Sequence, residues 1–203
     1  MKLVIIDYGM GNIKSVESAF KYLGVEDIVV SNKYEAFKAA DKLLLLGVGS
    51  FAKAMSNIKE MKIDKYLKEA LFQDKKPILG ICLGMQLLGN FSEEDGTSEG
   101  LNYIDMKCRK FSIKNIKIPH VGFNQVNINK NSTLFSDIDN KSDFYFTHSY
   151  KAESNVNICQ STCLYGDEFI VAYEKDNILG VQFHPELSQN NGLKLLNNYI
   201  EKF

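Results

Sequence analysis

One cysteine stands where an apolar strand is expected to turn into a helix. Cys82 lies in KPILGICLGMQLL, with Gly80 two residues before it and Gly84 two residues after it. This spacing is the cysteine form of the nucleophile elbow, a tight strand-to-helix turn in which the glycines relieve backbone crowding. Backbone N–H groups at the start of the helix favour a thiolate there. We predict that Cys82 is a nucleophile; the alternative is a small side chain that fills space between strand and helix.

A cysteine nucleophile needs a base, and the base needs a group that fixes its tautomer. His184 stands in GVQFHPELS directly after an expected strand, and Glu186 follows two residues later. A carboxylate at that spacing can turn back toward the imidazole, which predicts a triad of Cys82, His184 and Glu186. The alternative for His184 is an ordinary loop histidine. His120 and His148 have no acid at such a spacing, so we expect them to be structural or to line a substrate site.

The charge that develops during acyl transfer needs an oxyanion hole. One donor is expected to be the backbone N–H of Leu83, the residue after the nucleophile. The second is expected from the glycine-flanked peptide of LGVGSF, through the N–H of Val48 or Gly49. We call residues 47–49 the glycine loop; the alternative for this loop is a plain tight turn.

The elements that must position these residues alternate in the first half of the chain. Short apolar runs follow one another with segments of helical periodicity between them, which predicts a parallel sheet covered by helices on both faces. The expected strands are residues 3–6, 27–30, 43–46 and 77–81, and the expected helices are residues 13–23, 34–40, 53–72 (in one or two pieces) and the segment from 82 to 88.

The second half of the chain has a different residue pattern. β-Branched and aromatic residues alternate with polar ones, and helical periodicity is absent until the C-terminus. A polar stretch at residues 92–100 is expected to be a surface loop rather than a domain linker. Strands, some of them antiparallel, are expected at residues 103–110, 124–128, 144–147, 169–174 and 178–183, and a last helix at residues 193–200.

The length, charge and cysteine content of the chain indicate which classes of protein to expect. The chain has 203 residues, 24 Lys plus Arg against 25 Asp plus Glu, and a net charge of −1. We expect a single domain over residues 1–203 that needs no metal to fold, and no nucleic-acid partner, since the basic residues form no block. The four cysteines include no CxxC pair and are expected to be free thiols.

The N-terminal apolar run stops at Asp7 without a cleavage site behind it. No apolar run approaches the ~18 residues of a membrane span. We therefore expect a protein of the cytoplasm that does not enter a membrane.

With the elbow, the HPE segment and the glycine loop together, the sequence resembles the class I (triad) glutamine amidotransferases. Their motifs GxCxGxQ and FHPE are matched by GICLGMQ and QFHPE. Within that class the chain is most similar to the glutaminase subunit of imidazole glycerol phosphate synthase, through IDYGMGNIKSV, GVGSF, PHVGFN and FYFTHSY. The resemblance covers essentially the whole chain and implies an α/β fold: a doubly wound, open, mixed sheet with helices on both faces, the flavodoxin-like three-layer sandwich.

The resemblance also implies a reaction, the hydrolysis of glutamine through a γ-glutamyl thioester. Cys82 would attack the side-chain amide, His184 would protonate the leaving ammonia and later activate water, and Glu186 would orient His184. No cofactor is implied. The substrate glutamine would be bound by residues that match the pocket of the family: Gly47, Gln86, His148, Ser149 and Tyr150.

In the family, the ammonia passes to a (β/α)8-barrel cyclase subunit that makes imidazole glycerol phosphate in histidine biosynthesis. A chain of 203 residues has no room for that barrel, so a heterodimer with a separate cyclase is implied. Because glycines flank Val48, its peptide can turn away from the reaction site, and we expect slow glutamine hydrolysis until a partner biases this loop.

Three positions depart from the family pattern. The usual Pro before the GVG loop is Leu46, the usual Trp of the PHxGWN segment is Phe123, and the usual Lys after HPE is Leu187. In the family that Lys pairs with an acid of the cyclase, and this chain cannot form the ion pair. These departures leave open a glutaminase that serves a different synthase. Apart from them, two further alternatives stay open: a non-catalytic scaffold subunit and a free Cys-His hydrolase.

Overall fold

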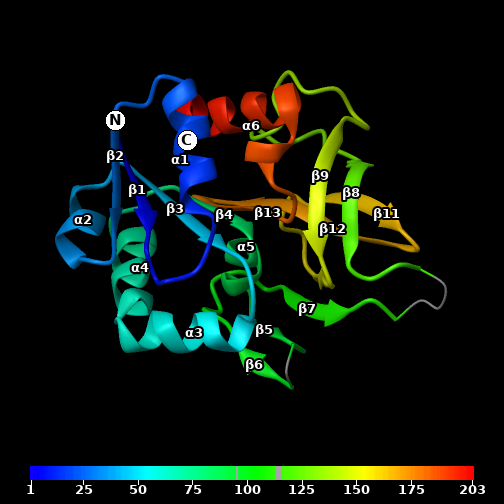
Figure 1. The fold of residues 1–203 in the computed structure, drawn as a ribbon, viewed down its shortest axis with the longest axis horizontal. Coiled ribbons are helices and arrows are strands. Elements are labelled where there is room, and N and C mark those ends of the chain that lie inside the picture. Colours follow the sequence, from blue (N-terminus) through cyan, green and yellow to red (C-terminus); the bar gives the residue numbers. More distant parts are fainter. Residues whose placement is uncertain (95, 113–115) are drawn as a thin grey trace.

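The molecule is built on a large mixed sheet with helices on both of its faces (Figure 1). The computed structural model describes residues 1–94, 96–112 and 116–203. Within them the sheet has the strand order β2-β1-β3-β4-β13-β12-β10-β7-β5-β6, with β11 paired to β12. The predicted doubly wound α/β sheet is confirmed.

Five neighbouring strands of this sheet are parallel, and they carry the predicted first half of the fold. In the order of the sheet they are β2 (Asp27–Ser31), β1 (Lys2–Ile6), β3 (Lys42–Gly47), β4 (Ile78–Cys82) and β13 (Ile178–Val181). The apolar runs of β1, β3, β4 and β13 are continuous because helices bury both faces of the sheet there, whereas β2 at the sheet edge is partly exposed.

Side chains alternate along these strands between two separate cores. Leu3 and Ile5 of β1 pack with the helices of one face, α1 (Ile13–Tyr22) and α6 (Gln189–Lys202). Val4 and Ile6 pack into the core on the opposite face, whose helices are α2 (Tyr34–Ala39), α3 (Phe51–Glu60), α4 (Ile63–Phe72) and α5 (Leu83–Leu87). The result is the three-layer arrangement that the resemblance implied (Figure 1).

Beyond β13 the sheet continues with mainly antiparallel pairs, and a two-stranded sheet is formed separately. The hairpin strands β8 and β9 pair from His120 with His148 to Gln125 with Asp143. The remaining elements are β5 (Phe91–Ser92), β6 (Ser98–Glu99), β7 (Lys107–Lys110), β8 (His120–Gln125), β9 (Asp143–His148), β10 (Tyr150–Glu153), β11 (Ser161–Tyr165), β12 (Asp167–Lys175) and the 3₁₀ turn Pro185–Leu187.

Several predictions for this half are wrong in their bounds. The strand predicted at residues 103–110 is shortened to β7, because the N–H groups of Tyr103 and Ile104 both donate to the Leu88 carbonyl at 3.0 Å and so leave the ladder. The strand predicted at residues 124–128 lies earlier, as β8. The predicted loop at residues 92–100 contributes to β5 and β6, although its Asp95 lies outside the described residues.

Candidate active site

Cys82 occupies a strained turn between β4 and α5. Its backbone has φ 55° and ψ −113°, a positive-φ conformation that L-residues rarely adopt. A Cβ added at Gly80 would lie 2.8 Å from the Met85 Cα, and one added at Gly84 would overlap the Leu45 carbonyl oxygen. Both glycines are therefore needed for the helix to start directly above the sheet, which confirms the predicted elbow.

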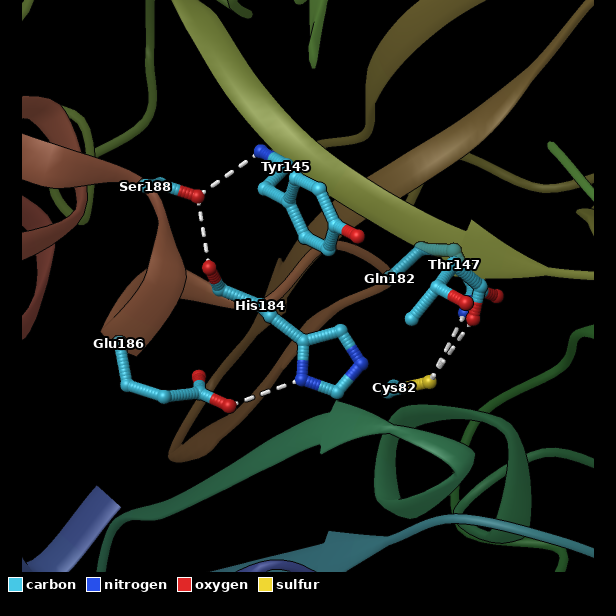
Figure 2. A network of polar contacts seen from close by, with 7 residues as sticks. All are labelled: Cys82, Tyr145, Thr147, Gln182, His184, Glu186 and Ser188. Carbon is cyan, nitrogen blue, oxygen red and sulfur yellow. Dashed lines mark hydrogen bonds and ion pairs between the residues drawn. The ribbon is translucent and has the colours of Figure 1, made fainter. Parts of the chain in front are cut away.

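His184 reaches the same place from the end of β13, the strand beside β4. Val181 of β13 pairs with Ile81 of β4, so the residues that follow each strand emerge at the same edge of the sheet. The Nδ1 atom of His184 lies 2.8 Å from the Glu186 Oε1 atom. The buried Nε2 atom has no hydrogen-bond partner among the described residues and lies on the edge of the ring that faces Cys82 (Figure 2).

The surroundings of His184 change its protonation. Burial opposes the charged form, but the neighbouring Cys82 side chain and the Glu186 carboxylate together raise the pKa of His184 to about 10. At neutral pH the imidazole therefore carries a proton on both nitrogens. The Nδ1 proton is held by Glu186, and the Nε2 proton faces the sulfur.

The loop that carries His184 is fastened to strand β9. The backbone N–H of His184 donates to the Tyr145 carbonyl at 2.8 Å. The Ser188 hydroxyl donates to the His184 carbonyl at 2.6 Å and accepts the Tyr145 N–H at 2.9 Å (Figure 2). These bonds fix the backbone of His184. The contact with Glu186 then determines the orientation of the imidazole ring.

The Cys82 sulfur has two further polar neighbours that sequence reasoning missed. The Thr147 carbonyl oxygen lies 3.9 Å from it, and the Gln182 Nε2 atom lies 3.7 Å from it (Figure 2). The Gln182 Oε1 atom accepts a hydrogen bond from the Gln86 Nε2 atom at 2.7 Å. Gln182 stands inside the QFHPE motif, two residues before His184, and this position was the available signal.

A cavity of about 440 Å³ opens beside the sulfur. It gathers eight of the predicted site residues, together with Ser50, Glu94, Pro119 and Thr147, which were not predicted. The other predicted site residues, Gly47, His184 and Glu186, do not line the cavity. The predicted residues that line it are Val48, Gly49, Cys82, Leu83, Gln86, His148, Ser149 and Tyr150.

Gly47 lies at the start of the glycine loop, against the Tyr8 hydroxyl and the Leu83 side chain. The Tyr8 hydroxyl donates to the Leu46 carbonyl at 2.5 Å. A Cβ at Gly47 would overlap that hydroxyl, so the residue is required for close packing. Gly49 has φ 100°, which suits a loop that presents backbone rather than side chain.

His148 is held by a chain of neutral hydrogen-bonding groups. Its Nδ1 atom lies 2.7 Å from the Tyr150 carbonyl and must donate to it, so its Nε2 atom accepts from the His120 Nδ1 atom at 3.0 Å. The His120 Nε2 atom in turn accepts from Asn124 at 3.3 Å. Burial lowers the pKa of His148 to about 3 and the pKa of His120 to about 4. Both imidazoles are therefore uncharged at neutral pH.

The described ranges contain neither a cluster of metal ligands nor a membrane-spanning helix. No cluster of three or more His, Cys, Asp or Glu side chains there could hold a metal ion. None of the helices in those ranges combines the length and the apolar character needed to cross a membrane.

Comparisons with known proteins identify the family of the chain. The family described as Glutamine amidotransferase class-I matches residues 4–203. The "Imidazole glycerol phosphate synthase subunit HisH 1" of Campylobacter jejuni is 47% identical over 199 residues, which cover 98% of each chain. The subunit HisH 2 of Methanococcus maripaludis is 45% identical over 203 residues, covering 98% of this chain and 99% of that protein. The subunit HisH of Aquifex aeolicus is 39% identical, covering 100% and 97%.

Solved structures share the fold at low sequence identity. A chain of PurLQS from Thermotoga maritima superposes with a TM-score of 0.75 at 16% identity, covering 98% of this chain and 97% of that one. The glutaminase domain of CTPS from Trypanosoma brucei superposes with a TM-score of 0.64 at 18% identity, covering 100% and 95%. The family match over residues 4–203 and the relatives at 39–47% identity show that the chain belongs to the class-I glutamine amidotransferases and, within them, is similar along its whole length to the HisH subunits.

Proposed function

We propose that this chain is the glutaminase subunit of an imidazole glycerol phosphate synthase. The observation that carries the proposal is the Cys82 sulfur at a strained elbow, with the Glu186-bound imidazole of His184 beside it and a cavity of about 440 Å³ in front of it. Glutamine is small enough to enter such a cavity with its side-chain amide next to the sulfur. The relatives at 39–47% identity carry the name of that synthase.

The reaction runs in two steps with one proton carrier. The Cys82 thiolate attacks the amide carbon of glutamine, the carbon–nitrogen bond breaks, and the His184 Nε2 atom gives its proton to the nitrogen, which leaves as ammonia. Water then adds to the thioester while His184 takes a proton from it, and the thiolate leaves from the γ-carboxyl of glutamate. Glu186 keeps the imidazole in the orientation that both transfers require.

Backbone donors and cavity residues complete the site. The N–H of Leu83 and the N–H of Val48 or Gly49 would stabilise the oxyanion. Gln86, His148, Ser149 and Tyr150, which line the cavity, would bind the substrate, and Gly47 would keep the loop close to them.

The ammonia would pass to a (β/α)8-barrel cyclase in a heterodimer of the cytoplasm. Val121, Phe123 and Leu187 are apolar residues exposed by 54%, 50% and 45%, which suits a docking face. We name these three residues the apolar face. The Phe123 ring packs on Tyr145 at 5.5 Å between centroids, and the Tyr145 N–H is bound by Ser188, the neighbour of Leu187. A partner seated there would contact the loop that holds His184.

One observation favours a second candidate, a glutaminase for a different synthase. Phe123 and Leu187, both on the apolar face, replace the Trp and Lys that are usual in the family. The substitutions change the partner surface and leave the cysteine, the histidine and the glutamate in place.

The test is a glutaminase assay on the purified chain and on its complex with the cyclase of the same organism. Turnover should be slow for the chain alone, rise when the cyclase and a ribulosyl phosphate ligand are added, and vanish in Cys82→Ala but not in the control Cys159→Ala. Turnover that survives in Cys82→Ala would refute the catalytic proposal. Activation by a different nucleotide or sugar ligand alone would support the second candidate.

A further inference from the structure

Gln182 is a completely buried amide that the proposed reaction does not yet use. Its exposed fraction is 0%, and it follows Val181 at the end of β13, directly beside the end of β4. A buried amide is costly unless its polar atoms are hydrogen-bonded. Both ends of the Gln182 side chain meet a partner, and one of those partners is the reacting sulfur.

The orientation of this amide is determined by Gln86. The Gln86 Nε2 atom donates to the Gln182 Oε1 atom at 2.7 Å. With its oxygen occupied in this way, Gln182 must turn its NH₂ group toward Cys82, whose Sγ atom lies 3.7 Å away. Gln86 is also buried, on the helix that begins directly after Cys82, so neither amide can turn over without breaking the bond between them.

We propose that Gln182 is a catalytic residue that stabilises the Cys82 thiolate by donating a hydrogen bond to it, and that Gln86 is a positioning residue that orients Gln182. An ionised acceptor gains more from such a bond than a neutral thiol does. The inference rests on the proposed role of Cys82 as nucleophile. It adds a donor whose effect is greatest when the sulfur carries its full charge, before the attack and again when the thiolate leaves the thioester.

The test measures thiolate formation without any glutamine turnover. Iodoacetamide, which enters the cavity and reacts with the ionised sulfur, is applied across pH 5–10, and alkylation of the Cys82 peptide is followed by mass spectrometry. The midpoint is the pH at which the alkylation rate of Cys82 is half of its maximum. In Gln182→Met, which removes the donor without adding charge, this midpoint should rise by about one pH unit. At a given pH below the midpoint, Cys82 should then react about tenfold more slowly. Gln86→Met should shift the midpoint in the same direction by a smaller amount.

Two controls separate this effect from damage to the fold. Gln73→Met makes the same change at an exposed position at the end of α4 and should leave the Cys82 profile unchanged. Cys159, a partly exposed thiol elsewhere, should react at the same rate in every variant. If Gln182→Met does not fold, Gln182→Glu keeps the size of the side chain, and it should raise the midpoint further because it turns an oxygen toward the sulfur.

An unchanged midpoint in a folded Gln182 variant would overturn the inference and leave the proposed glutaminase intact. Loss of turnover in Cys82→Ala tests that glutaminase separately, so the two proposals can fail independently.

Discussion

At the scale of single residues, three histidines of one chain are held in two charge states. Burial lowers the pKa of His120 to about 4 and the pKa of His148 to about 3, so neither titrates between pH 5 and 9. His184 is buried too, but the Cys82 side chain and the Glu186 carboxylate raise its pKa to about 10. Any histidine-dependent change of activity near or above neutral pH must therefore come from His184.

Replacing Glu186 with Gln should move the alkaline limb of glutamine hydrolysis to lower pH. The pKa of His184 is raised, so its acid form persists up to about pH 10. Without the carboxylate, burial is opposed by Cys82 alone, and this pKa should fall by about one unit or more. The measurement is kcat/KM for glutamine from pH 6 to 10. The control is Glu17→Gln, which removes a surface partner of Lys21. An alkaline limb at the same pH in the wild-type chain and in Glu186→Gln would contradict the role of Glu186 in raising the pKa of His184.

At the scale of elements, the parallel register brings together groups that are far apart in sequence. Gly47 of β3 pairs with Cys82 of β4, and Ile81 pairs with Val181 of β13. The glycine loop, the nucleophile and the loop of His184 therefore leave the sheet side by side, in the crevice where α/β sheets bind ligands. The close contact of Gly84 with the Leu45 carbonyl keeps α5 tight against this edge.

A methyl group at Gly84 should therefore cost far more stability than one at an open glycine. Gly84→Ala must displace the Leu45 carbonyl, and we expect a loss of about 3 kcal/mol in the free energy of unfolding, at the upper end of the cost of overpacking. Gly24→Ala has no atom within 4 Å of the new Cβ and only a strained φ of 87°, so about 1 kcal/mol is expected. Urea denaturation measures both, and equal losses would show that the elbow tolerates a side chain.

The sequence predicts the parallel half of the fold well because continuous apolar runs mark strands that are buried on both faces. β1, β3 and β4 agree with prediction to within a residue or two at each end. It does not predict β10, whose charged Lys151 is buried and paired with Glu153 and Asp167. An ion pair of this kind is invisible in a hydropathy pattern.

The candidate site also has a part that the sequence predicts and a part that it does not. The sequence predicts the triad residues because each stands in a short motif typical of nucleophilic catalysis. It does not predict Gln182, since its partners Gln86 and Cys82 are 96 and 100 residues away and only the folded sheet brings them together. The single domain over residues 1–203 stays a prediction.

At the scale of the whole molecule, the apolar face lies next to the segment that holds the imidazole. The rings of Phe123 and Tyr145 are 5.5 Å apart, and the Tyr145 backbone bonds to both His184 and Ser188. A partner that covers Phe123 would therefore press on the strand that fixes the His184 loop. In the proposed heterodimer, this connection would let docking alter the catalytic site.

Phe123→Glu should weaken binding to the cyclase by at least about tenfold, because a carboxylate would then be buried in an apolar contact. Phe72→Glu is a matched control, since Phe72 is an exposed phenylalanine at the end of α4, with 44% of its surface exposed against 50% for Phe123. Isothermal titration with the purified cyclase measures both affinities. Neither side chain lines the cavity beside Cys82, so both isolated variants should keep their basal turnover of glutamine, and any smaller change confined to Phe123→Glu would reflect the Phe123–Tyr145 contact. Equal affinities for the wild-type chain and Phe123→Glu would move the docking surface elsewhere on the molecule, whereas equal losses in both variants would indicate a nonspecific effect of the added charge.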